Sequence, residues 1–120
     1  METSVKKRRT RLIAHRGAEN FALRMEELAF FYTENKIVFV FDSLGKKYIC
    51  DKNLSELEEE LDENIFFRAN RQYIINVNFI KGFRIYEKVK LWVDMIIANH
   101  QPIIISQEMA PVFKKWINGV

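Results

Sequence analysis

A polar, basic insert interrupts two strand-forming runs between Phe66 and Asn76. It holds two arginines and two amides: Arg68, Asn70, Arg71 and Gln72. Alternating or fully apolar residues would pair and pack better in a sheet, so folding alone explains this composition poorly. Arginine bonds bidentately to guanine, asparagine and glutamine bond to adenine, and all of them bond to phosphate. The insert therefore predicts either a surface that reads nucleic acid or a strand-end turn whose side chains are solvated.

The remaining apolar residues are gathered in short runs typical of β-strands. The longest runs, such as Ile37–Phe41, contain five residues, whereas a membrane-spanning helix needs roughly 20. A chain of 120 residues with 48% hydrophobic content is long enough for one domain with its own core. Apolar patterning predicts strands at residues 12–14, 21–23, 29–32, 37–41, 47–50, around 89–93, and at 103–105. The fold class expected is therefore mostly β.

Two short helices are also expected. Leu54, Leu57 and Leu61 recur on one helical face, and Asn53 with Glu56 resembles a capping box at its start. We interpret Glu58-Glu59-Glu60 as its solvated face. Pro111 suits the first turn of a second helix running through Ile117.

The charge is unevenly distributed along the chain. Residues 1–24 hold seven Lys/Arg and two acids, residues 25–66 hold four and eleven, and residues 67–120 hold eight and three. Basic ends suit a polyanionic partner and would concentrate positive potential on part of the surface. The alternative is a solvated linker with ordinary surface lysines. We assign residues 1–10, which contain Lys6-Lys7-Arg8-Arg9, to a basic tail or linker, and residues 11–120 to the domain.

Single residues with reactive side chains give little sign of catalysis. Cys50 is the only cysteine and is interpreted as a small buried hydrophobe. His15 and His100 are far apart and next to turn signals, so both are interpreted as surface residues. The sequence has no spacing typical of a metal cage and no glycine-rich phosphate loop. We expect no enzyme activity, no cofactor, no membrane segment and, without an export signal, a cytoplasmic location.

Trp92 presents an open choice. Period-two alternation places it with the polar residues of its strand, Lys88, Lys90 and Asp94. It either lies across a neighbouring strand or under a loop, or it forms a contact between protomers.

Three polar segments stand at strand boundaries, where short loops on a stiff scaffold commonly carry function. They are Thr33–Lys36, Arg68–Gln72 and Ser106–Met109. We expect them to act together.

The pattern resembles the LytTR family of DNA-binding domains. The resemblance is carried by Phe67-Arg68, Asn70-Arg71-Gln72 and Tyr73-Ile74-Ile75-Asn76, and it extends from about Leu12 to Ile117. Further parts are Glu27–Lys36, Asn53–Leu57, Asn78–Phe83, Ile103–Ser106 and Pro111–Ile117. It implies an elongated stack of small antiparallel sheets with short helices, whose loops enter successive major grooves of double-stranded DNA.

The resemblance also implies site residues and partners. The positions transferred or adjoining are Thr33, Asn35, Lys36, Arg68, Asn70, Arg71, Gln72, Ser106 and Gln107. Gln107 departs from the family, which usually has arginine there, and glutamine favours adenine over guanine. The implied function is sequence-specific DNA binding by the output domain of a bacterial two-component transcription regulator. Such regulators act as pairs on direct repeats, behind a receiver domain that lies outside this sequence. The alternative is a protein-interaction or non-specific nucleic-acid-binding module on the same fold.

Overall fold

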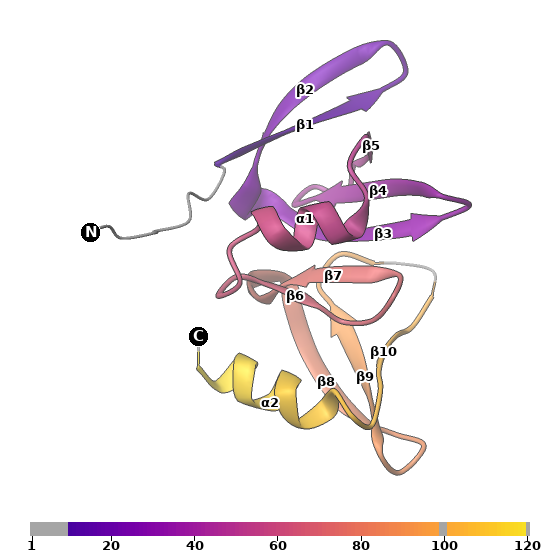
Figure 1. Cartoon of the computed structure of the whole chain (residues 1–120), viewed down its shortest axis with the longest axis vertical. Coiled ribbons are helices and arrows are strands. Elements are labelled where there is room, and N and C mark those ends of the chain that lie inside the picture. The colour runs from indigo at the N-terminus through magenta and orange to yellow at the C-terminus, as the bar shows by residue number, and fades with distance from the viewer. Residues whose placement is uncertain (1–9, 99–100, 120) are drawn as a thin grey trace.

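The computed structural model describes residues 10–98 and 101–119 (Figure 1). Ten strands form two antiparallel sheets within these residues. The larger sheet has the order β2-β1-β5-β4-β3-β7-β6, and the smaller one has the order β10-β9-β8. The larger sheet contains β1 (Arg11–Arg16), β2 (Glu19–Arg24), β3 (Leu28–Glu34), β4 (Ile37–Asp42), β5 (Lys47–Cys50), β6 (Phe66–Arg68) and β7 (Tyr73–Asn76). The smaller contains β8 (Ile80–Tyr86), β9 (Lys90–Met95) and β10 (Ile103–Ile105). These sheets confirm the mostly β fold class.

The central strands are covered on both faces. Phe31 of β3 and Ile74 of β7 point into one hydrophobic core, which lies under α1 (Leu54–Glu60). Phe30 and Ile75, one residue away on the same strands, point into a second core, shared with the small sheet and α2 (Ala110–Asn118). Burial on both faces explains why these strands consist of continuous apolar runs. Figure 1 shows the resulting stack, with the β1–β2 hairpin at one end and the small sheet with α2 at the other.

Each helix begins and ends within one residue of the position that its sequence predicts. The Asn53 side chain accepts a hydrogen bond from the Glu56 amide over 2.8 Å, and the Glu56 carboxylate accepts one from the Asn53 amide over 3.0 Å. This capping box is the one that the spacing indicates. Pro111 stands in the first turn of α2, and the buried ring of Phe113 anchors that helix to the second core. Both expected helices are confirmed.

A buried asparagine and two short 3-10 helices complete the connections. The 3-10 helices are Met25–Glu27 and Val77–Phe79. Asn76 is fully buried. Its side-chain nitrogen donates to the carbonyl oxygen of Leu28 over 2.9 Å, and its side-chain oxygen accepts from the backbone amide of Asn78. Asn76 thus ties the end of β7 to the start of β3, because a buried amide needs partners.

Trp92 lies on the outer face of the small sheet. The guanidinium of Arg84 on the adjacent strand lies 4.7 Å from the ring centroid, and the ring of Tyr86 packs edge-on at 5.3 Å. Arg84 also pairs with Asp94 over 3.1 Å. Packing across a neighbouring strand is therefore the arrangement seen within the chain, and a contact between protomers stays a prediction.

Candidate nucleic-acid interface

The first predicted segment is a tighter turn than the sequence indicates. β3 continues through Glu34 and β4 starts at Ile37, so only Asn35 and Lys36 form the turn. The expected loop over Thr33–Lys36 is wrong in this respect, because Thr33 is β-branched and pairs with β4 as a strand residue. Both turn residues have left-handed backbones, with φ of 53° and 66°, as two-residue hairpin turns require. Their exposed side chains stand at the tip of the hairpin.

The second segment, residues 69–72 between β6 and β7, is held by its own side chains. The Asn70 side-chain oxygen accepts hydrogen bonds from the amides of Gln72 and Tyr73, over 2.8 and 3.0 Å. The guanidinium of Arg68 donates to the carbonyl oxygens of Asn70 and Arg71, over 2.7 and 3.0 Å. Arg68 and Asn70 are half-buried, whereas Arg71 and Gln72 are exposed. The four polar residues therefore divide into two that build the loop and two that face outward.

The third segment is the turn between β10 and α2. The Ser106 carbonyl accepts from the amides of Met109 and Ala110, over 3.1 and 2.9 Å, and its hydroxyl oxygen also accepts from the Met109 amide at 3.3 Å. Ser106 is half-buried, while Gln107 is exposed. The turn thus leaves Gln107 at the surface directly beyond the sheet.

Hydrogen bonds join the three segments into one row. The amide of Thr33 at the end of β3 donates to the carbonyl oxygen of Gln72 over 3.0 Å. On the other side, the Asn70 side-chain nitrogen donates to the carbonyl oxygen of Ile104 in β10 over 2.9 Å. The loop 69–72 is therefore the middle member. A backbone hydrogen bond fixes it to β3, and the Asn70 side chain fixes it to β10. Segments far apart in the sequence are thus linked side by side, and their joint action stays a prediction.

A cavity of about 510 Å³ lies beside this edge. Its wall contains four cationic side chains: Lys36, Lys52, Arg68 and Arg71. Lys52 did not stand out in the sequence, because it is a lone lysine before a helix. Its ammonium pairs with the Glu60 carboxylate at 2.5 Å, which neutralises much of its charge. Lys36 and Arg71 are the exposed cations of this wall.

Known proteins resemble the chain in both sequence and fold. The model of the LytTr DNA-binding domain family matches residues 18–118. The chain belongs to this LytTR family. Its structure is similar to that of the LytTr DNA-binding domain of a putative methyl-accepting/DNA response regulator from Bacillus cereus, with a TM-score of 0.79 and 20% sequence identity. The similarity covers 91% of this chain and 97% of that one. A comparison with curated proteins gave no match.

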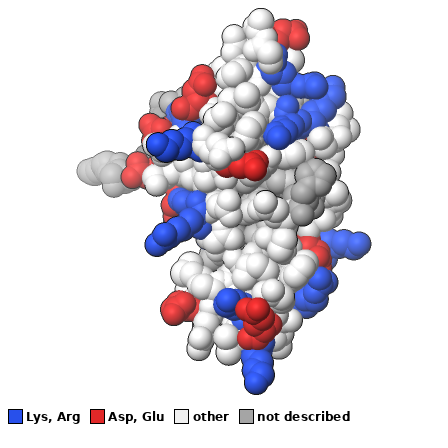
Figure 2. Space-filling model, turned by 90° about the vertical axis from the view of Figure 1, so that its right-hand side faces the viewer, with Lys and Arg blue, Asp and Glu red and all other residues white. Residues whose placement is uncertain are grey.

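Charge on this LytTR domain is less segregated in space than along the sequence. Figure 2 looks onto the side of the molecule where the β3–β4 turn and the β6–β7 loop end. Lys and Arg side chains lie there in separate groups, with Asp and Glu between them. The sequence suggested a concentrated positive field, but this face of the folded chain shows a broken pattern. Attraction to a polyanion would therefore depend on individual cations.

Within residues 10–98 and 101–119, the other reactive groups of the LytTR domain form no second site. Burial raises the pKa of the Cys50 thiol, so the buried sulfur is held in its neutral form. His15 Nε2 lies 3.4 Å from an Asp51 carboxylate oxygen and is half-buried, whereas His100 lies outside the described residues. Among those that are described, no three His, Cys, Asp or Glu side chains gather as metal ligands. No helix in the described ranges is long and apolar enough to cross a membrane.

Proposed function

We propose that this LytTR domain binds double-stranded DNA sequence-specifically, with its three joined segments entering major grooves. The row formed by the Thr33–Gln72 and Asn70–Ile104 hydrogen bonds supports this most strongly. The exposed side chains of Lys36, Arg71 and Gln107 stand close in sequence to these bonded groups, which supports a single stiff edge. Such an edge can present several polar groups to base edges at once with little loss of conformational entropy.

The proposal assigns different tasks to the candidate residues. Lys36, Arg71 and Gln107 contact bases or phosphates, one from each segment, with Asn35 and Gln72 beside them. Four others hold these contacts in place through hydrogen bonds that they make inside the protein: Thr33, Arg68, Asn70 and Ser106. Groove readout with amide and guanidinium groups then supplies specificity, and the phosphates supply salt-dependent affinity.

We further propose that the domain is the output part of a bacterial two-component regulator, acts in the cytoplasm, and binds direct repeats as two copies. Family membership and the response-regulator description of the similar Bacillus cereus protein support this role. The role is one of binding rather than catalysis.

Selection of bound sites from random duplex DNA tests the proposal. The selected duplex should bind at least about 10³ times more tightly than a scrambled one. The same measurement over a range of salt concentrations separates phosphate from base contacts. Equal affinity for selected and scrambled duplexes would favour the non-specific alternative. Absence of DNA binding at low salt would favour a protein-interaction module.

A further inference from the structure

The guanidinium of Arg68 makes three hydrogen bonds within the protein. Two of its nitrogens donate to the carbonyl oxygens of Asn70 and Arg71. Its side chain is 24% exposed. A guanidinium committed in this way has few donors left for a phosphate or a guanine. We therefore expect Arg68 to shape the DNA-binding edge rather than to contact DNA itself.

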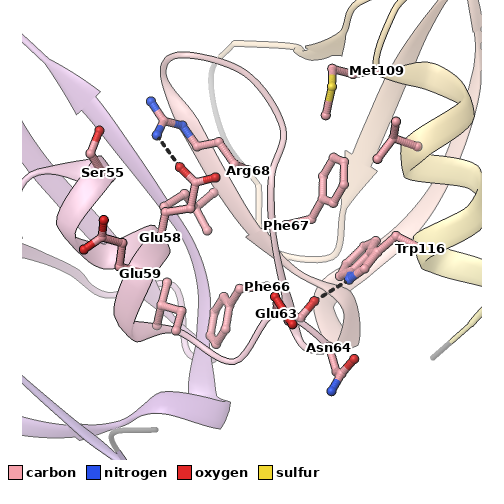
Figure 3. Close-up of a pocket in the computed structure, with 13 residues that line it drawn as sticks. Ser55, Glu58, Glu59, Glu63, Asn64, Phe66, Phe67, Arg68, Met109 and Trp116 are labelled. Atoms are coloured by element: carbon pink, nitrogen blue, oxygen red, sulfur yellow. Dashed lines mark hydrogen bonds and ion pairs between the residues drawn. The ribbon is translucent and has the colours of Figure 1, made fainter. Parts of the chain in front are cut away.

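The third bond of Arg68 connects the loop to a helix. Its Nη1 donates to a carboxylate oxygen of Glu58 in α1 over 3.1 Å. Figure 3 shows Glu58 turned toward Arg68 and Glu59, the next residue of the helix, turned away. The helix itself is fixed to the first core by Leu54 and Leu57, so Glu58 is attached to a rigid support.

We propose that Glu58 and Arg68 form a clamp that positions the loop 69–72 for reading DNA. The carbonyls held by Arg68 belong to residues 70 and 71, so the clamp fixes the backbone from which Arg71 and Gln72 project. A pre-positioned loop loses less conformational freedom on binding. Glu58, an acidic residue next to a DNA-binding edge, thus strengthens specific binding. This inference rests on the proposed function and makes Glu58 a positioning residue.

Whether Glu58→Gln weakens or tightens DNA binding tests the clamp. If only long-range charge mattered, Glu58→Gln and Glu59→Gln would each remove one negative charge and tighten binding to every duplex alike. The clamp instead predicts that Glu58→Gln weakens binding to the selected duplex by about two- to fivefold, the range for a partly exposed ion pair. Glu59→Gln should leave that affinity unchanged or raise it.

Arg68→Lys separates positioning from direct contact, because lysine keeps the charge but cannot hold two carbonyls and a carboxylate in one plane. The clamp predicts about a tenfold loss for the selected duplex, the scale of one or two lost hydrogen bonds. It also predicts weaker base preference in repeated site selection, and an unchanged affinity and salt dependence for scrambled DNA. If Arg68 instead contacted a phosphate, Arg68→Lys would keep most of the affinity for the selected duplex. Melting temperatures of all variants show whether the domain stays folded.

The outcomes distinguish the clamp from the function on which it rests. If wild type prefers no duplex over a scrambled one, the proposed function fails and the clamp with it. If wild type is selective and Glu58→Gln behaves like Glu59→Gln, only the clamp is wrong. Weaker, less selective binding by Glu58→Gln and Arg68→Lys, with Glu59→Gln unaffected, supports it.

Discussion

The side-chain nitrogen of Asn70 donates a hydrogen bond to the carbonyl oxygen of Ile104, 34 residues further along the chain, over 2.9 Å. The oxygen of the same side chain accepts from two amides of its own loop. One amide group therefore closes the loop and attaches it to the small sheet. Asparagine could recognise adenine, but most of the bonding capacity of Asn70 is used within the protein.

Asn70→Ala is expected to lower the free energy of unfolding by about 1–3 kcal/mol, because it removes two hydrogen bonds within the loop and the one to the Ile104 carbonyl. Chemical denaturation measures this directly. Gln72→Ala is the matched control, since it truncates an exposed amide of the same loop and should change stability by less than about 0.5 kcal/mol. Equal effects of the two substitutions would show that the hydrogen bonds of Asn70 add nothing.

Arg71→Ala should show the reverse pattern. Its side chain is exposed beside the cavity next to the row, so the melting temperature should hardly change. Affinity for the selected duplex should fall by about 1–3 kcal/mol, the value of a good base contact. Lys114→Ala removes an exposed cation from α2 and controls for the loss of charge. If both variants bind equally well, Arg71 does not contact a base.

The sequence predicted most of the architecture because the signals for it are local. The apolar stripe from Leu54 to Leu61 and the Asn53–Glu56 cap suffice for α1, and the short apolar runs suffice for most strands. β8 (Ile80–Tyr86) was not predicted from such a run, because polar residues and a glycine interrupt its apolar residues. The length of the β3–β4 turn was wrong because two adjacent non-glycine residues, Asn35 and Lys36, adopt left-handed backbones. Neither side chain strongly predicts a left-handed backbone.

The division of labour within the central insert could not be predicted in the same way. Whether Arg68 and Asn70 face inward depends on Glu58 and Ile104, which lie 10 and 34 residues away in the sequence. Glu58 itself looked like one of three equivalent solvated carboxylates. Its pairing appears only when β6 is placed beside α1, and hydrogen-bond partners across such distances leave no periodic signal in a single sequence.

The basic segment Lys6–Arg9 lies outside the described residues, and its role stays a prediction. It carries four cations in succession, a composition that suits contacts with phosphates. Replacing all four by alanine should therefore weaken binding to selected and scrambled duplexes by similar factors and reduce the salt dependence. A titration with both duplexes at several salt concentrations measures this. Unaltered binding at low salt would mark the segment as a linker only.

Cys50 provides a pH-dependent test of the first core. Burial raises the pKa of its thiol in the folded state. The buried neutral thiol therefore contributes fully to folding stability below the unfolded pKa of about 8.5. This contribution is lost as the pH rises through the higher pKa of the folded state. Thiol reagents react with the thiolate, so labelling at pH 8 should be slow in the folded domain and fast in denaturant. Fast labelling without denaturant would contradict the buried position.

Gln107→Arg tests the third segment at the position where the family resemblance leads us to expect arginine. Glutamine pairs best with N6 and N7 of adenine, and arginine with O6 and N7 of guanine. The variant should therefore shift preference toward guanine at one position of each half-site. Its extra positive charge would also strengthen binding to every sequence, so the change in base preference is the decisive result. Site selection with wild type and variant in parallel measures it, and identical preferences at every position would show that residue 107 does not reach a base edge.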